Sequence, residues 1–317
     1  MPEFTENEAV SLSTRPKGRY NLAMYKKILA AINEHLNSEV AAGYAIALAK
    51  AAGAKLYLAF VAERGLSPSA LKAAEEAMAR LFQRAAEMAV EAEAITETGD
   101  PVKKIREIVM REGVDITFAS TRKADIKRRF YAGTVSRKLS LSLPCSVALV
   151  RVVHAGRVHP QKILVPLRAR VDHVEERAYF SAMLARAFEG EVYPFHVHKP
   201  ISKFFHGEVH LTPVEWEKRL PKDISAFIEE LKKYGVAHLG VSARGRAGRA
   251  IAIEALLKRH DLIVMGKSRR SLLSSFIRGN PVEEVLRETP CDLIILQPRK
   301  GFQAPSKGLQ APRRANS

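Results

Sequence analysis

The chain of 317 residues contains one sequence pattern twice, and this internal repeat constrains its fold more than any other feature. The segment Lys27–Val61 matches Lys162–Val197, at an offset of 135 residues where the two segments start. A second block, Gly99–Val135, matches Gly245–Pro281 at an offset of 146 residues. The larger offset predicts an insertion in the second repeat, around Pro200–Trp216. The chain therefore consists of two homologous units.

Within each repeat, short apolar strands alternate with helical patterns, as the first repeat illustrates. Strands are predicted near Lys27–Ile32, Leu56–Val61, Ala94–Thr98, Ile116–Ala119 and Ser146–Val150. Helices are predicted near Val40–Ala52, Ser69–Val90, Val102–Glu112 and Gly133–Leu143. Apolar strands without polar alternation are typical of a parallel sheet that helices cover on both faces. We therefore predict an α/β protein with two repeated, doubly wound parallel-sheet domains.

The repeats divide the chain into four parts. These are an N-terminal extension (1–23), a first domain (24–153), a second domain (160–299) and a basic tail (300–317). The tail is rich in Pro, Gly, Ser and Gln and almost lacks large apolar residues, so we predict that it is disordered.

The charge and the cysteine content limit the classes of function. The formal net charge is +17, which would attract phosphates and other anions. The sequence has no DNA-reading motif and no basic stripe interleaved with aromatic residues, so we do not expect a nucleic-acid partner. We also find no apolar run long enough for a membrane span, no secretory signal and no disulfide framework. These features predict a cytoplasmic protein.

The ligand site of such a fold is predicted by its topology. In doubly wound sheets, ligands bind at the carboxyl ends of strands, near the loops that follow the first and fourth strands. In the second repeat the fourth strand leads into LIVMGKSRRSLLSSFIRGNPV (Leu262–Val282), which combines glycines, serines and cations. Such a loop at a strand end is typical of a phosphate site. Its spacing, however, fits neither the Walker nor the dinucleotide fingerprint.

These segments resemble the universal stress protein family, in a tandem form. The resemblance rests on the opening strands ILAAI and ILVPL, the block AIALAKAAGAKLYLAFV, the strand DLIVMG and the closing strand TPCDLIIL. It covers Lys26–Arg151 and Lys162–Arg299. It implies the fold of the adenine nucleotide alpha hydrolase-like proteins. It also implies a pseudo-two-fold arrangement in which the closing strands, Ser146–Val150 and Asp292–Leu296, meet at the interface.

In this family, members that bind ATP carry Gly-x2-Gly-x9-Gly-Ser/Thr after the fourth strand, and an aspartate that ends the first strand reads the adenine. In the second repeat, the resemblance assigns a nucleotide site to Gly266, Arg269, Arg278, Gly279 and Asn280. Arg269 and Asn280 replace the second glycine and the closing hydroxyl. Arg168 stands at the aspartate position and cannot accept the adenine amino proton. Arg269 either pairs with a phosphate or fills the space that a phosphate would need.

In the first repeat, the resemblance gives a weaker site. Its residues are Asn33, Ser120, Lys123, Gly133 and Thr134. Ser120 and Lys123 replace the first two glycines, and Asn33 replaces the aspartate but keeps an amide that can contact adenine. Neither repeat carries the complete motif. For each loop, a connection that binds no ligand is therefore the alternative interpretation.

The resemblance predicts a stress-response regulatory module that binds ATP or another adenine nucleotide, with Mg²⁺ accompanying it. Two alternatives stay open: a nucleotide-free scaffold with a basic surface, and a weak phosphohydrolase. No nucleophile motif and no evident general base is present, so we expect binding rather than turnover. The predicted partners are the nucleotide, the other repeat in an internal pseudo-dimer, and further copies in a homo-oligomer.

Histidines and cysteines form two further groups. One potential zinc cluster comprises His196, His198, His206 and His210. We prefer to interpret these as polar residues at a strand end and in a loop, and we predict no metal site. Cys145 and Cys291 occupy equivalent positions and are predicted to be small buried residues.

Overall fold

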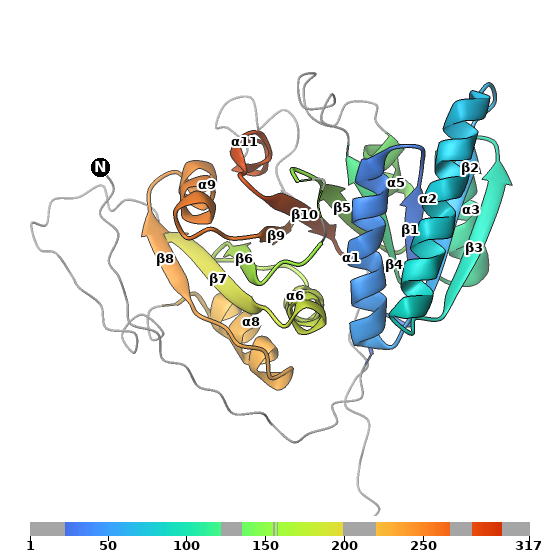
Figure 1. Cartoon of the computed structure of the whole chain (residues 1–317). Coiled ribbons are helices and arrows are strands. Elements are labelled where there is room, and N and C mark those ends of the chain that lie inside the picture. The colour runs from blue at the N-terminus through green and yellow to red at the C-terminus, as the bar shows by residue number, and fades with distance from the viewer. Residues whose placement is uncertain are drawn as a thin grey trace, which may run out of the picture.

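The computed structural model describes residues 23–121, 135–154, 156, 158–198, 220–266 and 281–299. Residues 1–22 of the N-terminal extension, the insertion around Pro200–Trp216 and the tail 300–317 lie outside this range. The first repeat contains β1 (Lys27–Ile32), α1 (Leu36–Ala52), β2 (Lys55–Ala62), α2 (Pro68–Glu87), β3 (Ala92–Thr98), α3 (Pro101–Glu112), β4 (Ile116–Thr121), α5 (Val135–Ser142) and β5 (Ser146–Arg151) (Figure 1).

The second repeat has the same order of elements. It contains β6 (Lys162–Leu167), α6 (Val174–Phe188), β7 (Glu191–His198), α8 (Lys222–Lys233), β8 (Val241–Arg244), α9 (Ala247–Leu257), β9 (Leu262–Gly266), α11 (Pro281–Glu288) and β10 (Asp292–Gln297). The strands predicted for the first repeat are all present, with ends that differ by at most two residues.

Capping residues explain why α2 and α3 begin one residue earlier than the periodicity predicts. Pro68 and Pro101 stand in the first turn, where a missing N–H group costs little. The residues before them cap the helices: Ser67 Oγ and Asp100 Oδ1 each accept a hydrogen bond from the backbone N–H three residues on, at 3.2 and 2.8 Å. These local contacts are not visible in the apolar pattern.

The described strands form one sheet in the order β3-β2-β1-β4-β5-β10-β9-β6-β7-β8. Neighbours within each repeat run parallel, whereas β5 and β10 run antiparallel at the centre. Leu149 pairs with Ile295. These two residues are 146 positions apart, so equivalent residues of the two repeats meet on the axis that relates them. The prediction that the closing strands meet at a pseudo-two-fold interface is confirmed.

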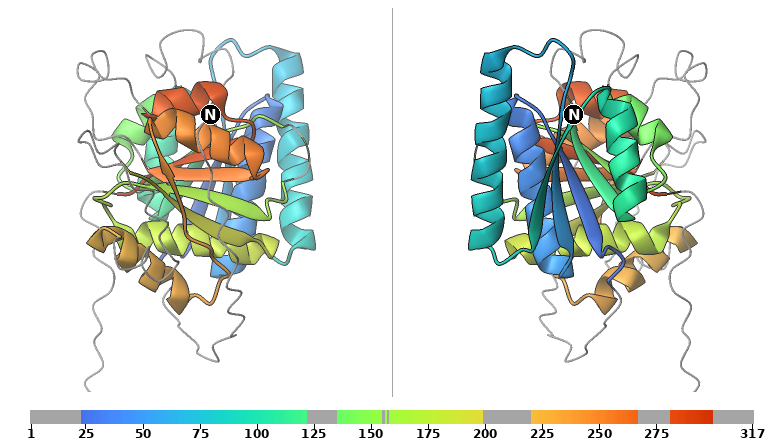
Figure 2. Two further views of the ribbon diagram at one scale, coloured as in Figure 1. Left: turned by 90° about the vertical axis from the view of Figure 1, so that its left-hand side faces the viewer. Right: turned by 90° about the vertical axis from the view of Figure 1, so that its right-hand side faces the viewer.

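Helices cover both faces of the sheet, which confirms the doubly wound architecture; Figure 2 shows the sheet between its two helical layers at each end of the molecule. One apolar core lies under α1, α2, α6 and α8, and a second lies under α3, α5, α9 and α11. Both cores continue from one repeat into the other. Phe118 on β4, for example, stacks on Phe180 of α6 with 6.1 Å between ring centroids. The repeats therefore bury their apolar surface together.

The aspartates that precede the fourth strands have a structural role. Asp115 Oδ2 accepts hydrogen bonds from the two N–H groups that open β1, at 2.8 and 3.1 Å. Asp261 Oδ2 does the same for the N–H groups that open β6, at 3.0 and 2.9 Å. Each carboxylate thus joins the first strand of its repeat to the fourth, at the edge opposite the carboxyl ends of these strands.

Candidate functional site

The antiparallel pairing of β5 with β10 places the two candidate crevices at opposite edges of the sheet. In each repeat, the crevice lies at the carboxyl ends of the parallel strands. The carboxyl ends of β9 and β10 lie at the edge where β5 begins, because Gly266 is in register with Leu296, and Gln297 with Val147. Each crevice is therefore bordered by the amino edge of the other repeat.

The structure describes part of the predicted nucleotide sites. Gly266, Ser120 and Asn33 lie at the carboxyl ends of their strands, as predicted. The other predicted residues lie outside the described part of the chain: Arg269, Arg278, Gly279, Asn280, Lys123, Gly133 and Thr134. The described walls of each crevice are thus the strand ends and the first helix of the repeat.

In the second repeat, the side chain of Arg177 lies against Gly266. A Cβ atom built on Gly266 would be 3.0 Å from the guanidinium carbon of Arg177 and 3.2 Å from each terminal nitrogen. Arg177 belongs to the first turn of α6, and Gly266 ends β9. The glycine therefore lets a guanidinium pack on the backbone at the carboxyl end of the sheet, where a larger residue would force the arginine to move.

The surroundings of Arg177 disfavour its positive charge. Burial lowers the pKa of the Arg177 guanidinium below its ordinary value, and the like charge of Arg168 lowers it further, while Asp172 acts in the opposite direction. The group stays protonated at neutral pH. Within the described part of the chain, no carboxylate forms an ion pair with it. Two arginines and one aspartate thus lie close together near the ends of β6 and β9.

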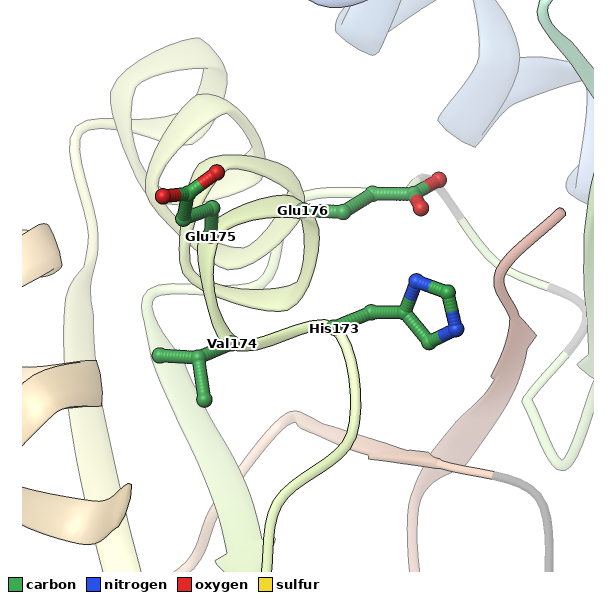
Figure 3. A pocket seen from close by; sticks show the side chains of 4 residues that line it. All are labelled: His173, Val174, Glu175 and Glu176. Carbon is green, nitrogen blue, oxygen red and sulfur yellow. The ribbon is translucent and has the colours of Figure 1, made fainter. Parts of the chain in front are cut away.

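A cavity of about 240 Å³ lies at the start of α6 and is lined by His173, Val174, Glu175 and Glu176. Figure 3 shows that His173 and Glu176 extend to the same side of the helix, away from Val174 and Glu175. His173, which precedes the helix, has a left-handed backbone conformation with φ of 51°. The first turn of α6 therefore presents polar side chains in two directions, toward this cavity and toward Gly266.

In the first repeat, the residues that follow β1 at the corresponding crevice are hydrogen-bonded to one another. Asn33 Oδ1 accepts a hydrogen bond from the N–H of His35 (3.0 Å). The buried Ser38 hydroxyl lies 3.0 Å from the carbonyl of Asn33 and 2.8 Å from that of His35. These contacts let α1 begin at Leu36, four residues before its predicted start. The oxygen of the Asn33 amide, the group that the resemblance offers for an adenine contact, is therefore engaged by the loop.

Sequence reasoning missed Arg177 and Glu176. Both helices end at a residue in the left-handed conformation, Gly53 for α1 and Glu189 for α6. Counting back from these residues, Glu176 and Arg177 occupy the positions of Val40 and Ala41, which are buried and apolar. The sequence carried one signal of this difference: two adjacent charged residues in the second repeat stand where the first repeat has two apolar residues. It was hidden because the segment from the start of the first strand to the left-handed residue is one residue longer in repeat 2 (162–189) than in repeat 1 (27–53), which shifts the alignment of the helices.

The family model described as the universal stress protein family matches residues 24–151 and 160–297. The chain belongs to the universal stress protein family. It contains the family domain twice, as the repeat predicted.

Two of the following three solved structures share this fold. A universal stress protein from Archaeoglobus fulgidus superposes with a TM-score of 0.58 at 18% identity, over 89% of this chain and 98% of its own. A functionally unknown protein from Pseudomonas aeruginosa gives 0.56 at 19% identity, over 87% and 95%. A universal stress protein in complex with cAMP covers 42% of this chain, with a TM-score of 0.34 and 17% identity. No curated protein matches the chain.

In this universal stress protein, the two cysteines and His196 are buried. Cys145 and Cys291 are buried, and burial raises the pKa of their thiols to about 11 and about 12. The ring of His196 is also buried, with Nδ1 3.0 Å from the carbonyl oxygen of Leu167. Among the described residues, no group of three His, Cys, Asp or Glu side chains could hold a metal ion. No helix in this part of the chain is long and apolar enough to span a membrane.

Proposed function

We propose that this protein is a regulatory binding module whose second repeat binds a phosphate-bearing ligand, with an adenine nucleotide as the first candidate. The observation that carries this proposal is the guanidinium of Arg177 packed on Gly266. It lies at the strand end where ligands of doubly wound sheets bind. The stress-response role and the cytoplasmic location belong to the same proposal, on the basis of the family.

The electrostatics of this crevice support an anion. Burial disfavours the charge of Arg177, and Arg168 repels it, while Asp172 offsets part of this repulsion. A bound phosphate would relieve both effects, because it supplies opposite charge and replaces lost hydration. Guanidinium groups also match the geometry of phosphate oxygens better than ammonium groups do. The first turn of α6 adds backbone N–H groups at the positive end of the helix dipole.

The described residues fit the phosphate part of a nucleotide better than its base. Gly266 keeps the family glycine, but Arg177 covers it. A phosphate would therefore meet a guanidinium where other members offer backbone N–H groups. At the position of the adenine-reading aspartate, Arg168 offers donors and no acceptor. We therefore expect weak selection among bases, and affinity that depends mainly on the phosphates and falls with added salt.

Titration with a fluorescent ATP analogue tests this proposal, with inorganic triphosphate as the competitor that lacks a base. Arg177→Ala should weaken binding about tenfold or more, the effect of losing a charge-assisted contact to phosphate. Arg186→Ala is the matched control, because it removes one positive charge from the last turn of the same helix. Its affinity should equal that of the wild type at physiological salt. The absence of saturable binding by the wild type would favour the ligand-free scaffold instead.

A further inference from the structure

Glu176 connects the crevice of the second repeat to the first repeat. Its side chain leaves the first turn of α6 and is buried, with 1% of the residue exposed. Glu176 Oε1 accepts hydrogen bonds from the hydroxyl of Tyr25 (2.9 Å), which precedes β1, and from that of Ser146, which opens β5. The Ser146 hydroxyl in turn accepts a hydrogen bond from the backbone N–H of Arg299 (3.0 Å). One carboxylate thus ties α6 to three distant segments of the chain.

The pseudo-two-fold axis places the equivalent position of the second repeat at the opposite edge of the sheet, where the contact between the repeats is built differently. There the carboxylate is on the strand: Asp292, which opens β10, is equivalent to Ser146. Asp292 Oδ2 accepts a hydrogen bond from the hydroxyl of Tyr44 on α1 (2.9 Å). Its Oδ1 accepts from the N–H groups of Val153 (2.8 Å) and His154 (3.3 Å). Both oxygens of Asp292 are therefore hydrogen-bonded.

By comparison, only one of the two carboxylate oxygens of Glu176 is hydrogen-bonded to a described residue. Its Oε2 is buried and makes no hydrogen bond with any described residue, and a buried unpaired oxygen destabilises a fold rather than stabilising it. The fold does not require a carboxylate here, since the equivalent position in α1 holds the buried Val40. A charged residue that the architecture does not need, and that is incompletely paired, is better explained by function than by stability.

We infer that Glu176 is a positioning residue that couples ligand binding at Arg177 to the contact between the two repeats. This inference rests on the proposed function. Glu176 and Arg177 are adjacent in one helical turn: the first contacts Tyr25 and Ser146, and the second contacts Gly266. Because the turn moves as a unit, the hydroxyls of the first repeat fix where the Arg177 guanidinium lies. A ligand that binds the guanidinium in this position favours the same placement of the turn, and with it the contact with the first repeat. Such coupling is reciprocal.

A matched pair of tyrosine variants tests this coupling. Tyr25→Phe and Tyr44→Phe each remove one hydroxyl from a buried bond between a tyrosine and a carboxylate of the other repeat. Both should lower stability by a similar amount. Only Tyr25→Phe should lower the affinity for the fluorescent ATP analogue, by about threefold to tenfold, because the guanidinium that binds the ligand is no longer held in place. Only Tyr25→Phe should speed hydrogen exchange of the backbone amides at residues 175–178. Ser146→Ala supplies a second variant should Tyr25→Phe fold poorly, with the same expected pattern.

The outcomes separate the two proposals. Binding by the wild type, with equal affinities for Tyr25→Phe and Tyr44→Phe, would overturn the coupling and leave the proposed function standing. If the wild type binds neither the ATP analogue nor inorganic triphosphate, the proposed function fails. In that case hydrogen exchange decides the positioning role: faster exchange at 175–178 in Tyr25→Phe alone supports it, and equal exchange in both variants overturns it.

Discussion

The two repeats of this protein share one fold but use it differently. At the ends of α1 and α3, repeat 1 places glycines at the left-handed residues, Gly53 and Gly113. In repeat 2 the equivalent residues are Glu189 and Arg259, which adopt the same conformation with φ of 54° and 52°. A side chain in that conformation costs free energy that glycine avoids. Repeat 2 therefore carries local strain at these two helix ends, whereas the exchange is reversed after α2 and α8, where Ala89 of repeat 1 (φ of 54°) is equivalent to Gly235 of repeat 2 (φ of 62°).

The two repeats also differ in the side chains that they bury. Repeat 1 buries Ile108 and Val114 where repeat 2 buries Glu254 and His260, which lie 146 positions further along. Glu254 Oε1 lies 3.7 Å from Nε2 of His260, and neither ring nitrogen of His260 has a hydrogen-bond partner in the part of the chain that the structure describes. Among the described residues, the buried carboxyl and imidazole groups all lie in repeat 2 (Glu176, His196, Glu254, His260 and Asp292), whereas the buried polar residues of repeat 1 are serines and threonines. The comparison suggests that repeat 1 mainly stabilises the sheet and that repeat 2 performs the binding role.

The largest effect on stability is expected when the buried polar pair of repeat 2 is replaced by its repeat 1 equivalents. The double variant Glu254→Ile with His260→Val should stabilise the protein by about 1 to 3 kcal/mol, because well-packed apolar residues avoid the desolvation of a poorly satisfied pair. Urea denaturation at neutral pH measures this change. A loss of stability would mean that the pair is better satisfied than repeat 1 suggests, and would weaken the contrast between the repeats.

A smaller effect is expected at the end of α6. Glu189→Gly should stabilise the protein by roughly 0.5 to 1 kcal/mol, since glycine adopts the left-handed conformation without steric cost. The matched change in repeat 1, Gly53→Ala, should destabilise it by about 1 kcal/mol for the same reason. Nothing lies within 4 Å of a Cβ on Gly53, so this test isolates backbone strain. Changes of the same sign in both variants would refute the argument from strain.

Much of the fold could be predicted from the sequence because the strands are apolar and the repeat shows which segments are equivalent. The pairing of β5 with β10 was also predicted, though from the family resemblance and not from the pattern. Helix starts were less predictable: α1 depends on the hydroxyl of Ser38, and α2 and α3 on their capping residues. Such contacts are made by single polar side chains, which leave no periodic signal.

The candidate site was harder to predict than the fold. The motif led to Gly266, but the residue that packs on it comes from another element, 89 positions earlier in the chain. Glu176 and Arg177 are ordinary residues for the first turn of an exposed helix, so only the tertiary structure shows that they point inward. Whether Arg269 contacts a phosphate stays a prediction, since it lies outside the described residues.

The central claim, that ligand binding depends on the guanidinium packed on Gly266, is tested most directly by exchanging the equivalent residues of the two repeats. Gly266→Ser adds a Cβ that would lie 3.0 Å from the Arg177 guanidinium, so the arginine must move. Ser120→Gly is the reciprocal change in repeat 1. In titrations with the fluorescent ATP analogue, we expect one site per chain, affinity reduced about tenfold in Gly266→Ser, and unchanged affinity in Ser120→Gly. Equal affinities in both variants, or a loss confined to Ser120→Gly, would contradict the account.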